Sequence, residues 1–329
     1  MIKVAINGFG RIGRMVFKAG LENRNIQFVA INDLTPVETL SYLLQHDSVH
    51  GQYKKKVSFK GNNLIVNGKS FPVYAEKDPA KLPWKKHKVD VVAECTGRFT
   101  KLKDAQLHLK AGAKKVLISA PGKDGCPTYV YGVNHKEYKG EKVISNGSCT
   151  TNCLAPLAKL LNEKCEIVSG FLNTIHAYTS TQNLVDGPNK KMRRCRAAAQ
   201  NIVPTSTGAA VAVTEVVPEL KGRMDGIAMR VPIVDGSVID FTFIANKKTS
   251  VKEINSLVKK ACQKELKGVV QYSTDELVST DILTNPYSAI FDSKLTDVHD
   301  QLIRIIAWYD NEWGFSNRMI DVIKLMARK

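Results

Sequence analysis

The 329-residue sequence predicts an α/β protein of two domains, the first built on a parallel sheet and the second an α+β domain with a mainly antiparallel sheet. Its length exceeds what one ordinary core accommodates. The first half alternates short apolar strands with helices, which is typical of a parallel sheet with crossover helices. Longer strands follow from about residue 150. We place the first domain at residues 1–148, completed by a C-terminal helix at 312–329, and the second at 149–311.

The first half opens with a strand at Lys3–Asn7, a helix at Arg11–Glu22 and a strand at Ile26–Asn32. A lysine-rich insert, Gly51–Val73, contains Asn67-Gly68, a dipeptide that favours tight hairpin turns. The insert therefore predicts a hairpin region. Three later elements complete the parallel pattern: a strand at Val89–Glu94, a helical stretch at Leu102–Ala111 and a strand at Lys115–Ser119.

The second half begins with a helix at Thr150–Asn162. Four strands are expected: Ile167–Thr179, Asp225–Val234, Ser237–Ala245 and Gln301–Tyr309. Gly236 separates the second from the third of these, which predicts a hairpin. Three more helices are expected: Gly208–Val217, Val251–Glu265 and Asn317–Ala327. The polar, basic stretch Thr181–Val203 has little periodicity, and a loop of that length in a compact domain is usually functional.

Composition limits the class of protein. Lys and Arg number 48 against 31 Asp and Glu, a net charge of +17 that attracts polyanions. The lysines are dispersed and lack interleaved aromatic residues, so a solvated basic surface is favoured over nucleic-acid binding. No apolar run is long enough to span a bilayer and no signal peptide is recognisable, so we expect a cytoplasmic protein. The seven scattered cysteines show no metal-binding spacing, and we expect no metal.

The first strand runs into a dinucleotide-binding fingerprint, with glycines at Gly8, Gly10 and Gly13. These glycines permit a tight turn, close approach to a pyrophosphate and close helix–strand packing. The amides at the helix start, including those of Arg11 and Ile12, would hold the pyrophosphate charge. Asp33 ends the second strand, where a carboxylate binds ribose hydroxyls and disfavours a 2′-phosphate. The first domain is therefore predicted to be a Rossmann domain that binds NAD.

Further polar residues follow later strands of the same predicted sheet. Thr96 and Gly97 come after one strand and Ser119 after another, at the carboxyl ends where open α/β sheets bind ligands. Each could be an ordinary turn residue, but with the fingerprint present we expect them to contact the cofactor.

Cys149 stands at the start of a predicted helix, where the positive end of the helix lowers the pKa of a thiol. His176, on a later strand, is the candidate partner, and an adjacent imidazole would lower that pKa further. Such a pair supplies a nucleophile and an acid–base group for a carbonyl substrate. On these residues alone, a buried structural cysteine and a core histidine remain an equal alternative.

The chain resembles the phosphorylating, NAD-dependent glyceraldehyde-3-phosphate dehydrogenases of glycolysis over essentially its whole length. The matching segments are Ile6–Arg14, Glu94–Gly97, Ser148–Cys153, His176–Thr179, Pro204–Ala210, Arg230–Pro232 and Trp308–Glu312. The order Ser-Cys-Thr-Thr-Asn-Cys together with the fingerprint is highly specific. The resemblance implies that Cys149 attacks the aldehyde of glyceraldehyde 3-phosphate, that His176 takes a proton, and that inorganic phosphate cleaves the resulting thioester to give 1,3-bisphosphoglycerate.

The resemblance also implies roles for individual residues. Thr179 and Arg230 match the subsite for the substrate's phosphate, and four residues match that for the attacking phosphate: Ser148, Thr150, Thr207 and Gly208. Asn311 matches the residue that holds the nicotinamide carboxamide. Lys77 stands where the family often has arginine, so its contact to the cofactor is in doubt. The loop Thr181–Val203 implies a homotetramer, because in the family it lies near a neighbouring subunit's cofactor.

Two alternatives remain from the sequence. An erythrose-4-phosphate dehydrogenase would use the same cysteine and NAD without phosphorolysis. A basic polyanion-binding role would rest on the net charge of +17 alone.

Overall fold

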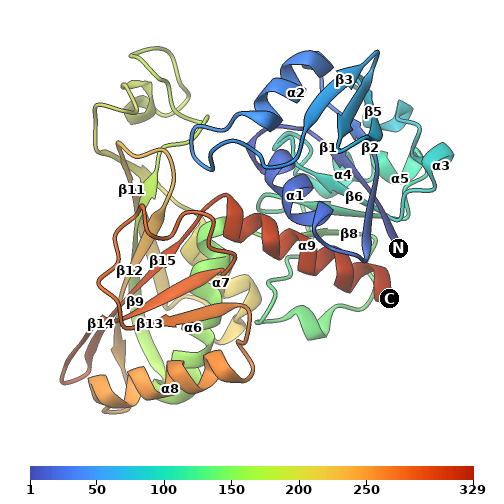
Figure 1. Ribbon diagram of the computed structural model, residues 1–329. Coiled ribbons are helices and arrows are strands. Elements are labelled where there is room, and N and C mark those ends of the chain that lie inside the picture. The colour runs from blue at the N-terminus through green and yellow to red at the C-terminus, as the bar shows by residue number, and fades with distance from the viewer. The chain divides into compact units, whose positions relative to one another are not determined.

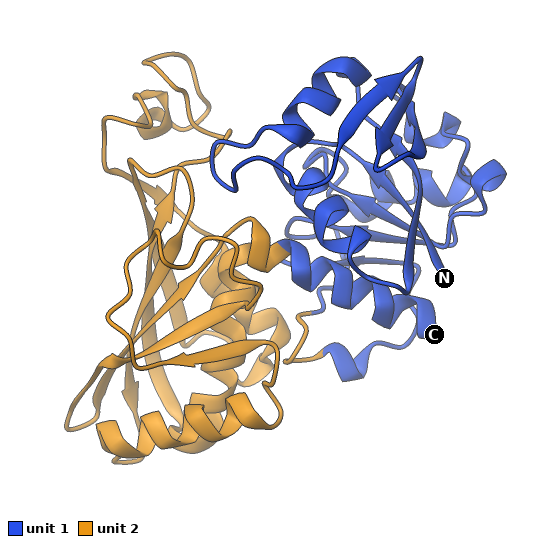
Figure 2. Ribbon diagram, viewed as in Figure 1, with its two compact units in different colours: residues 1–129, 135–147, 316–329 blue, residues 130–134, 148–315 orange.

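The computed structural model describes residues 1–329, which fall into two compact units (Figures 1 and 2). Unit 1 comprises Met1–Tyr129, His135–Gly147 and Ser316–Lys329. Unit 2 comprises Val130–Asn134 and Ser148–Phe315. None of the helices combines the length and apolar character that crossing a bilayer requires.

Unit 1 is built on an eight-stranded sheet in the order β3-β4-β5-β2-β1-β6-β7-β8. Its strands are β1 Ile2–Asn7, β2 Ile26–Asn32, β3 Val57–Lys60, β4 Asn63–Val66, β5 Lys69–Tyr74, β6 Val91–Glu94, β7 Lys115–Ile118 and β8 Val143–Ser145. Every pair from β5 to β8 along the sheet is parallel. The insert forms the antiparallel β3-β4-β5 edge, as predicted, with Gly61 and Gly68 in left-handed conformation at its turns.

The helices of unit 1 are short apart from α1 and α9. Their bounds are α1 Arg11–Leu21, α2 Val37–Gln45, α3 Trp84–His87, α4 Leu102–Ala105, α5 Leu107–Lys110 and α9 Trp313–Arg328, of which Ser316 onward belongs to this unit. The predicted helix at Leu102–Ala111 is thus two single turns, and α2 was not predicted. Helix α1 packs tightly, because a Cβ at Gly20 would stand 2.5 Å from the ring of Phe28 and 3.1 Å from Ile320.

The fingerprint glycines differ in what surrounds them, which yields a stability prediction. A Cβ at Gly13 would lie 2.0 Å from the carbonyl oxygen of Gly8, whereas a Cβ at Gly10 meets nothing within 4 Å. We expect Gly13→Ala to lower the free energy of unfolding by at least about 3 kcal/mol, because backbone must move to admit the methyl group. Gly10→Ala is the matched control and should change it by less than about 1 kcal/mol. Urea unfolding of both variants measures this, and equal stabilities would contradict the packing argument.

Unit 2 is built on a seven-stranded sheet in the order β10-β11-β9-β12-β15-β14-β13. Its strands are β9 Ile167–Ala177, β10 Val203–Ser206, β11 Met224–Val231, β12 Ser237–Ala245, β13 Val270–Ser273, β14 Ala289–His299 and β15 Leu302–Tyr309. Four of the six neighbouring pairs are antiparallel, which confirms the predicted class.

One predicted pairing is wrong. The strands on either side of Gly236, β11 and β12, do not form a hairpin, because β9 lies between them and pairs with both. The turn itself exists, since Gly236 has a φ of 84° and a Cβ there would lie 2.5 Å from the carbonyl oxygen of Ser279. A local turn signal therefore located the turn but not the neighbours of the strands.

Three helices cover one face of the unit 2 sheet: α6 Cys149–Cys165, α7 Ala209–Val216 and α8 Val251–Gln263 (Figure 1). Every second side chain of a strand points toward these helices, and Phe241 and Phe243 of β12 are almost completely buried there. This core fixes the first turn of α6 beside the carboxyl end of β9, where the candidate reactive residues lie.

Candidate active site

A hollow of about 810 Å³ opens in unit 1 at the carboxyl ends of β1, β2 and β6. This is the edge at which open parallel sheets bind ligands. Five predicted cofactor residues line it: Gly8, Gly10, Asp33, Lys77 and Thr96. Its other lining residues are Asn7, Asn32, Leu34, Glu76, Cys95, Arg98, Phe99 and Asp104.

The glycine turn is shaped by the close approach of two strand ends. Gly8 has a φ of 91°, and a Cβ there would lie 2.7 Å from the amide nitrogen of Thr96. The Asp33 carboxylate accepts the amide of Phe9 at 2.6 Å and the amide of Thr35 at 2.9 Å, so it is held at the end of β2. Gly10 caps α1 without any side-chain hydrogen bond, and the space beside it is open. The first-turn amides and the open space suit the pyrophosphate of a dinucleotide.

The remaining predicted cofactor residues lie around this hollow or in the other unit. Arg11, Ile12 and Gly13 form the first turn of α1, and Gly97 follows Thr96. Ser119 hydrogen-bonds the thiol of Cys95, which lines the hollow. Asn311 belongs to unit 2, where its side-chain oxygen accepts the Ser237 hydroxyl at 2.6 Å.

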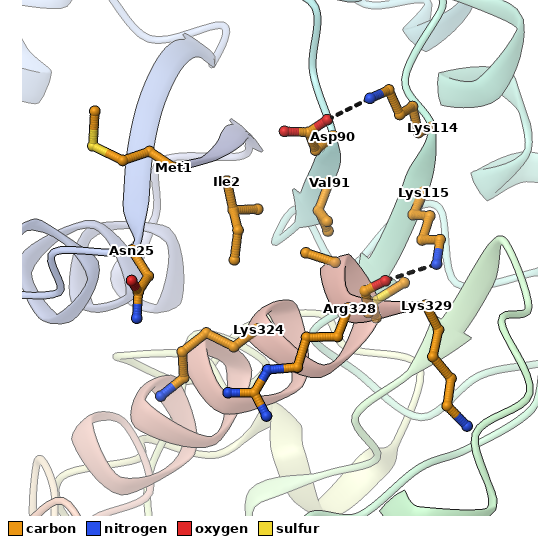
Figure 3. Close-up of a pocket in the computed structure, with 12 residues that line it drawn as sticks. Met1, Ile2, Asn25, Asp90, Val91, Lys114, Lys115, Lys324, Arg328 and Lys329 are labelled. Carbon is orange, nitrogen blue, oxygen red and sulfur yellow. Dashed lines mark hydrogen bonds and ion pairs between the residues drawn. The ribbon is translucent and has the colours of Figure 1, made fainter.

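A second hollow of unit 1, of about 600 Å³, lies at the opposite, amino ends of the strands (Figure 3). It is strongly basic, and its lysines are engaged in structural contacts. Lys115 donates to the carbonyl of Met326 at 2.7 Å near the end of α9, and Lys114 pairs with Asp90 at 2.8 Å. Basic side chains are favoured at a helix C-terminus, which accounts for those gathered at the end of α9.

In unit 2, Cys149 is the first residue of α6, as predicted. Ser148 caps the helix, and its hydroxyl accepts the amide of Thr151 at 3.0 Å. The sulfur of Cys149 lies 3.4 Å from Nε2 of His176, which β9 carries at its end. The strand and the helix therefore bring together the two residues that the sequence analysis paired.

The protonation of this pair differs from the expectation. Burial raises the pKa of the Cys149 thiol above its ordinary value, although the Arg230 charge and hydrogen bonds from Thr150 lower it. Burial and the neighbouring Arg230 charge lower the pKa of His176 to about 3, so the imidazole is neutral at neutral pH. The sequence analysis expected the helix start and the adjacent imidazole to lower the pKa of the Cys149 thiol, but burial outweighs the contacts that lower it.

The hydrogen bond behind the ring fixes its orientation. Nδ1 of His176 lies 2.7 Å from the carbonyl oxygen of Ala177, which can only accept, and 2.8 Å from a guanidinium nitrogen of Arg230, which can only donate. Nε2 of the same ring faces the sulfur of Cys149. Arg230 donates to the same carbonyl at 2.8 Å and holds its guanidinium against the ring.

The predicted phosphate residues fall into two places in unit 2. Arg230 lies beside His176, and the Thr179 hydroxyl lies 2.9 Å from that of Thr181. Thr207 and Gly208 stand at the start of α7, where Gly208 is the N-cap and is exposed. Thr150 is 4 % exposed and shares its hydroxyl with Tyr309 at 2.8 Å.

Comparison with known proteins agrees with this geometry. The family described as "Glyceraldehyde 3-phosphate dehydrogenase, NAD binding domain" matches residues 2–102, and "Glyceraldehyde 3-phosphate dehydrogenase, C-terminal domain" matches residues 148–311. The chain is 52% identical over 331 residues to a glyceraldehyde-3-phosphate dehydrogenase of Geobacillus stearothermophilus, covering 100% of this chain and 99% of that one. It is 51% identical to glyceraldehyde-3-phosphate dehydrogenase 1 of Bacillus subtilis (100% and 99% covered) and 50% to that of Bacteroides fragilis (100% of both).

The chain belongs to the glyceraldehyde-3-phosphate dehydrogenase family. Membership confirms the predicted fold class, a Rossmann domain with an α+β domain, and the predicted cofactor, NAD. The protein is thus an NAD-dependent oxidoreductase.

The sequence analysis missed two residues that lie near Cys149 and His176 in this glyceraldehyde-3-phosphate dehydrogenase family member. Arg194, in the loop Thr181–Val203, donates to Thr205 at 3.0 Å and to Thr181 at 3.3 Å, and its charge lowers the pKa of His176. Its only signal was a cluster of basic residues at positions 190–196, too diffuse to single one out. Tyr309 joins the hydroxyls of Thr150 and Thr174, both at 2.8 Å, and nothing in the strand pattern distinguishes it from a core residue.

Proposed function

We propose that this chain oxidises and phosphorylates D-glyceraldehyde 3-phosphate to 1,3-bisphosphoglycerate in glycolysis, using NAD and inorganic phosphate. The observation that carries the proposal is the contact of 3.4 Å between the sulfur of Cys149 and Nε2 of His176. A thiol paired with a neutral base at a helix start is suited to covalent attack on a carbonyl carbon.

Cys149 and His176 together perform the first step. As the Cys149 sulfur bonds the aldehyde carbon, its proton passes to Nε2 of His176, which returns it to the former carbonyl oxygen and so gives the thiohemiacetal hydroxyl. The incipient thiolate is stabilised by Arg230 and Thr150, the groups that lower the pKa of this thiol. NAD, when bound, supplies the acceptor for the hydride of the thiohemiacetal carbon, while His176 acts as base for its hydroxyl proton. A phosphate oxygen then attacks the thioester carbon, the carbon–sulfur bond breaks, and the Cys149 thiolate is released.

Two phosphate subsites serve these steps in our proposal. Thr179, Arg230 and the newly found Arg194 bind the substrate's phosphate, because their hydroxyl and guanidinium groups suit phosphate oxygens. Ser148, Thr150, Thr207 and Gly208 serve the attacking phosphate at the starts of α6 and α7, where helix amides favour anions. The hydroxyl of Thr150 already bonds Tyr309, so this residue contributes mainly by supporting the sulfur.

We propose that NAD occupies the 810 Å³ hollow, with its pyrophosphate on the amides of Gly10, Arg11 and Ile12 and its adenosine ribose on Asp33. Thr96 and Lys77 line the same hollow, and Gly97 and Ser119 flank it. Asn311, held by Ser237, is proposed to bind the carboxamide.

The Asp33 assignment leads to a prediction about cofactor preference. Asp33→Ala removes a charged acceptor for two hydroxyls, so the Kd for NAD should rise about 10- to 100-fold while that for NADP changes little. Glu38→Ala is the control, because it removes the same charge from an exposed position in the first turn of α2. Titration with both cofactors measures the ratio, and an unaltered preference for NAD in Asp33→Ala would refute the assignment.

The activity itself is tested by NADH formation from glyceraldehyde 3-phosphate with and without inorganic phosphate. Phosphate-dependent NADH supports the proposed reaction. Turnover that is indifferent to phosphate, with erythrose 4-phosphate as the better substrate, would replace it with the non-phosphorylating alternative.

We also propose a homotetramer in the cytoplasm. The loop Thr181–Val203 exposes four large apolar side chains, an arrangement typical of protein–protein contacts. They are Leu184, Val185, Met192 and Ile202. Light scattering coupled to size-exclusion chromatography tests the assembly, and a monomer at micromolar concentration would contradict it.

A further inference from the structure

Below the cofactor hollow, the Glu94 carboxylate is buried at the end of β6 with 1 % of its surface exposed. One of its oxygens accepts the Asn7 amide at 2.6 Å and Nε2 of His108 at 3.0 Å. The other accepts both the amide, at 2.8 Å, and the hydroxyl of Thr96. Asn7 and Thr96 both line the hollow, so a single buried side chain holds two parts of its wall.

Trp84 fixes the direction of the hydrogen bond between His108 and Glu94. Its indole can only donate, and it donates to Nδ1 of His108 at 2.9 Å. Nδ1 therefore carries no proton, and Nε2 must carry the proton that it gives to Glu94. His108 is neutral in this arrangement.

The backbone of Glu76 fixes the orientation of the side-chain amides of Asn32 and, through it, Asn7. The amide of Glu76 donates to the side-chain oxygen of Asn32 at 2.9 Å, and the Asn32 amide donates to the carbonyl of Glu76 at 2.9 Å. The same Asn32 amide donates to Asn7 at 2.7 Å, which leaves the Asn7 amide as a donor to Glu94. The side-chain amide of Asn7 or Asn32 cannot be flipped without breaking one of these hydrogen bonds.

All four groups that contact the Glu94 carboxylate are therefore donors, and only an ionised carboxylate can accept them all. We propose that Glu94 is a positioning residue for NAD: its carboxylate sets Thr96 and Asn7 in the wall of the cofactor hollow. Thr96 in turn lies against Gly8, where a Cβ would meet its amide at 2.7 Å, so displacing Thr96 disturbs the glycine turn as well. This inference rests on the proposed placement of NAD in the hollow.

Glu94→Gln tests the proposal, because it preserves shape but puts an N–H group against a donor in either orientation. The Kd for NAD should rise about 10-fold or more, while kcat at saturating NAD changes less than about 2-fold, since the lost alignment affects binding before chemistry. Tyr129→Phe is the control: it removes another hydrogen bond of unit 1, from the Tyr129 hydroxyl to Glu141 at 2.8 Å, away from the hollow. Its Tm should fall and its Kd for NAD should not change.

A double variant separates positioning from general destabilisation. Trp84→Phe removes the donor that fixes His108, so in Trp84→Phe/Glu94→Gln the imidazole can move its proton to Nδ1 and accept from the amide introduced at position 94. The double variant should bind NAD at least about 3-fold more tightly than Glu94→Gln, the opposite of two additive losses. If Glu94→Gln alone does not fold, the double variant is compared with Trp84→Phe. This comparison gives the effect of Glu94→Gln on the Kd for NAD when the donor at position 84 is absent.

The outcomes distinguish this inference from the site assignment on which it rests. A lower Tm for Glu94→Gln with an unchanged Kd would overturn the positioning role, as would a double variant weaker than both singles. If Asp33→Ala also leaves the Kd unchanged, the hollow is not the cofactor site and the proposed placement fails with it. If Asp33→Ala weakens binding and Glu94→Gln does not, the positioning inference alone fails.

Discussion

Replacing Cys149 with serine is expected to lower kcat by about 10³- to 10⁶-fold, the range seen when a covalent nucleophile is lost. A serine hydroxyl is far less acidic than a thiol and is a much weaker nucleophile at neutral pH. Binding should persist, because the proposed NAD contacts lie mainly in unit 1. The measurement is the initial rate of NADH formation at saturating substrate, NAD and phosphate.

Cys153→Ser is the matched control for this variant. Cys153 lies one helical turn beyond Cys149, is fully buried and has its sulfur 3.9 Å from the carbonyl oxygen of Ala307. It should keep kcat within about 3-fold while losing some stability, since a hydroxyl replaces a sulfur in a tightly packed core. Retention of more than a tenth of the activity by Cys149→Ser, or equal losses in the two variants, would remove Cys149 from the mechanism.

Patterns that are local in the sequence predicted the parallel half of the fold well. Strand Ile26–Asn32 and helix α1 follow from period-two and helical patterns that need only a few neighbouring residues. Helix α2 was missed because it is only nine residues long and offers a weak pattern. Strand β14 was missed because Lys294 and Asp297 interrupt its apolar run, and its pairing with β15 shifts register there.

Properties that depend on distant parts of the chain were not predictable. The hairpin at Gly236 failed because β9, about 60 residues earlier, occupies the place between the two strands. The Glu94 network likewise joins Asn7, Asn32 and His108 from three separate elements, and each alone resembles an ordinary polar residue.

For Cys149 and His176 too, the features set by neighbouring residues were predictable and those set by distant parts of the chain were not. The position of Cys149 at a helix start was readable from the residues that follow it. The direction of its pKa shift was not, because burial by the packed unit outweighs the favourable contacts from Arg230 and Thr150.

Replacing His176 with asparagine should lower kcat by about 10²- to 10⁴-fold, the usual contribution of a general base. Asparagine keeps a side-chain amide that can donate to the carbonyl of Ala177, so the loss should reflect the missing base at Nε2. The exposed His299 at the end of β14 is the control, and His299→Asn should leave the rate unchanged. A rate for His176→Asn within about 10-fold of wild type would exclude His176 as the base.

The same substitution should change how stability depends on pH. The folded pKa of His176 is lowered to about 3 from an ordinary 6.5, so the unfolded chain binds this proton more readily between those values. The free energy of unfolding of the wild type therefore falls progressively as the pH falls from 6.5 toward 3. At a pH of about 5 this penalty is about 2 kcal/mol, and His176→Asn does not carry it.

Urea unfolding of both proteins at about pH 7.5 and about pH 5 measures the difference. The variant should gain about 2 kcal/mol relative to wild type on acidification. An unchanged difference would mean that His176 stays protonatable in the folded protein. In that case Nε2 would carry a proton beside Cys149 at mildly acidic pH and would favour the thiolate.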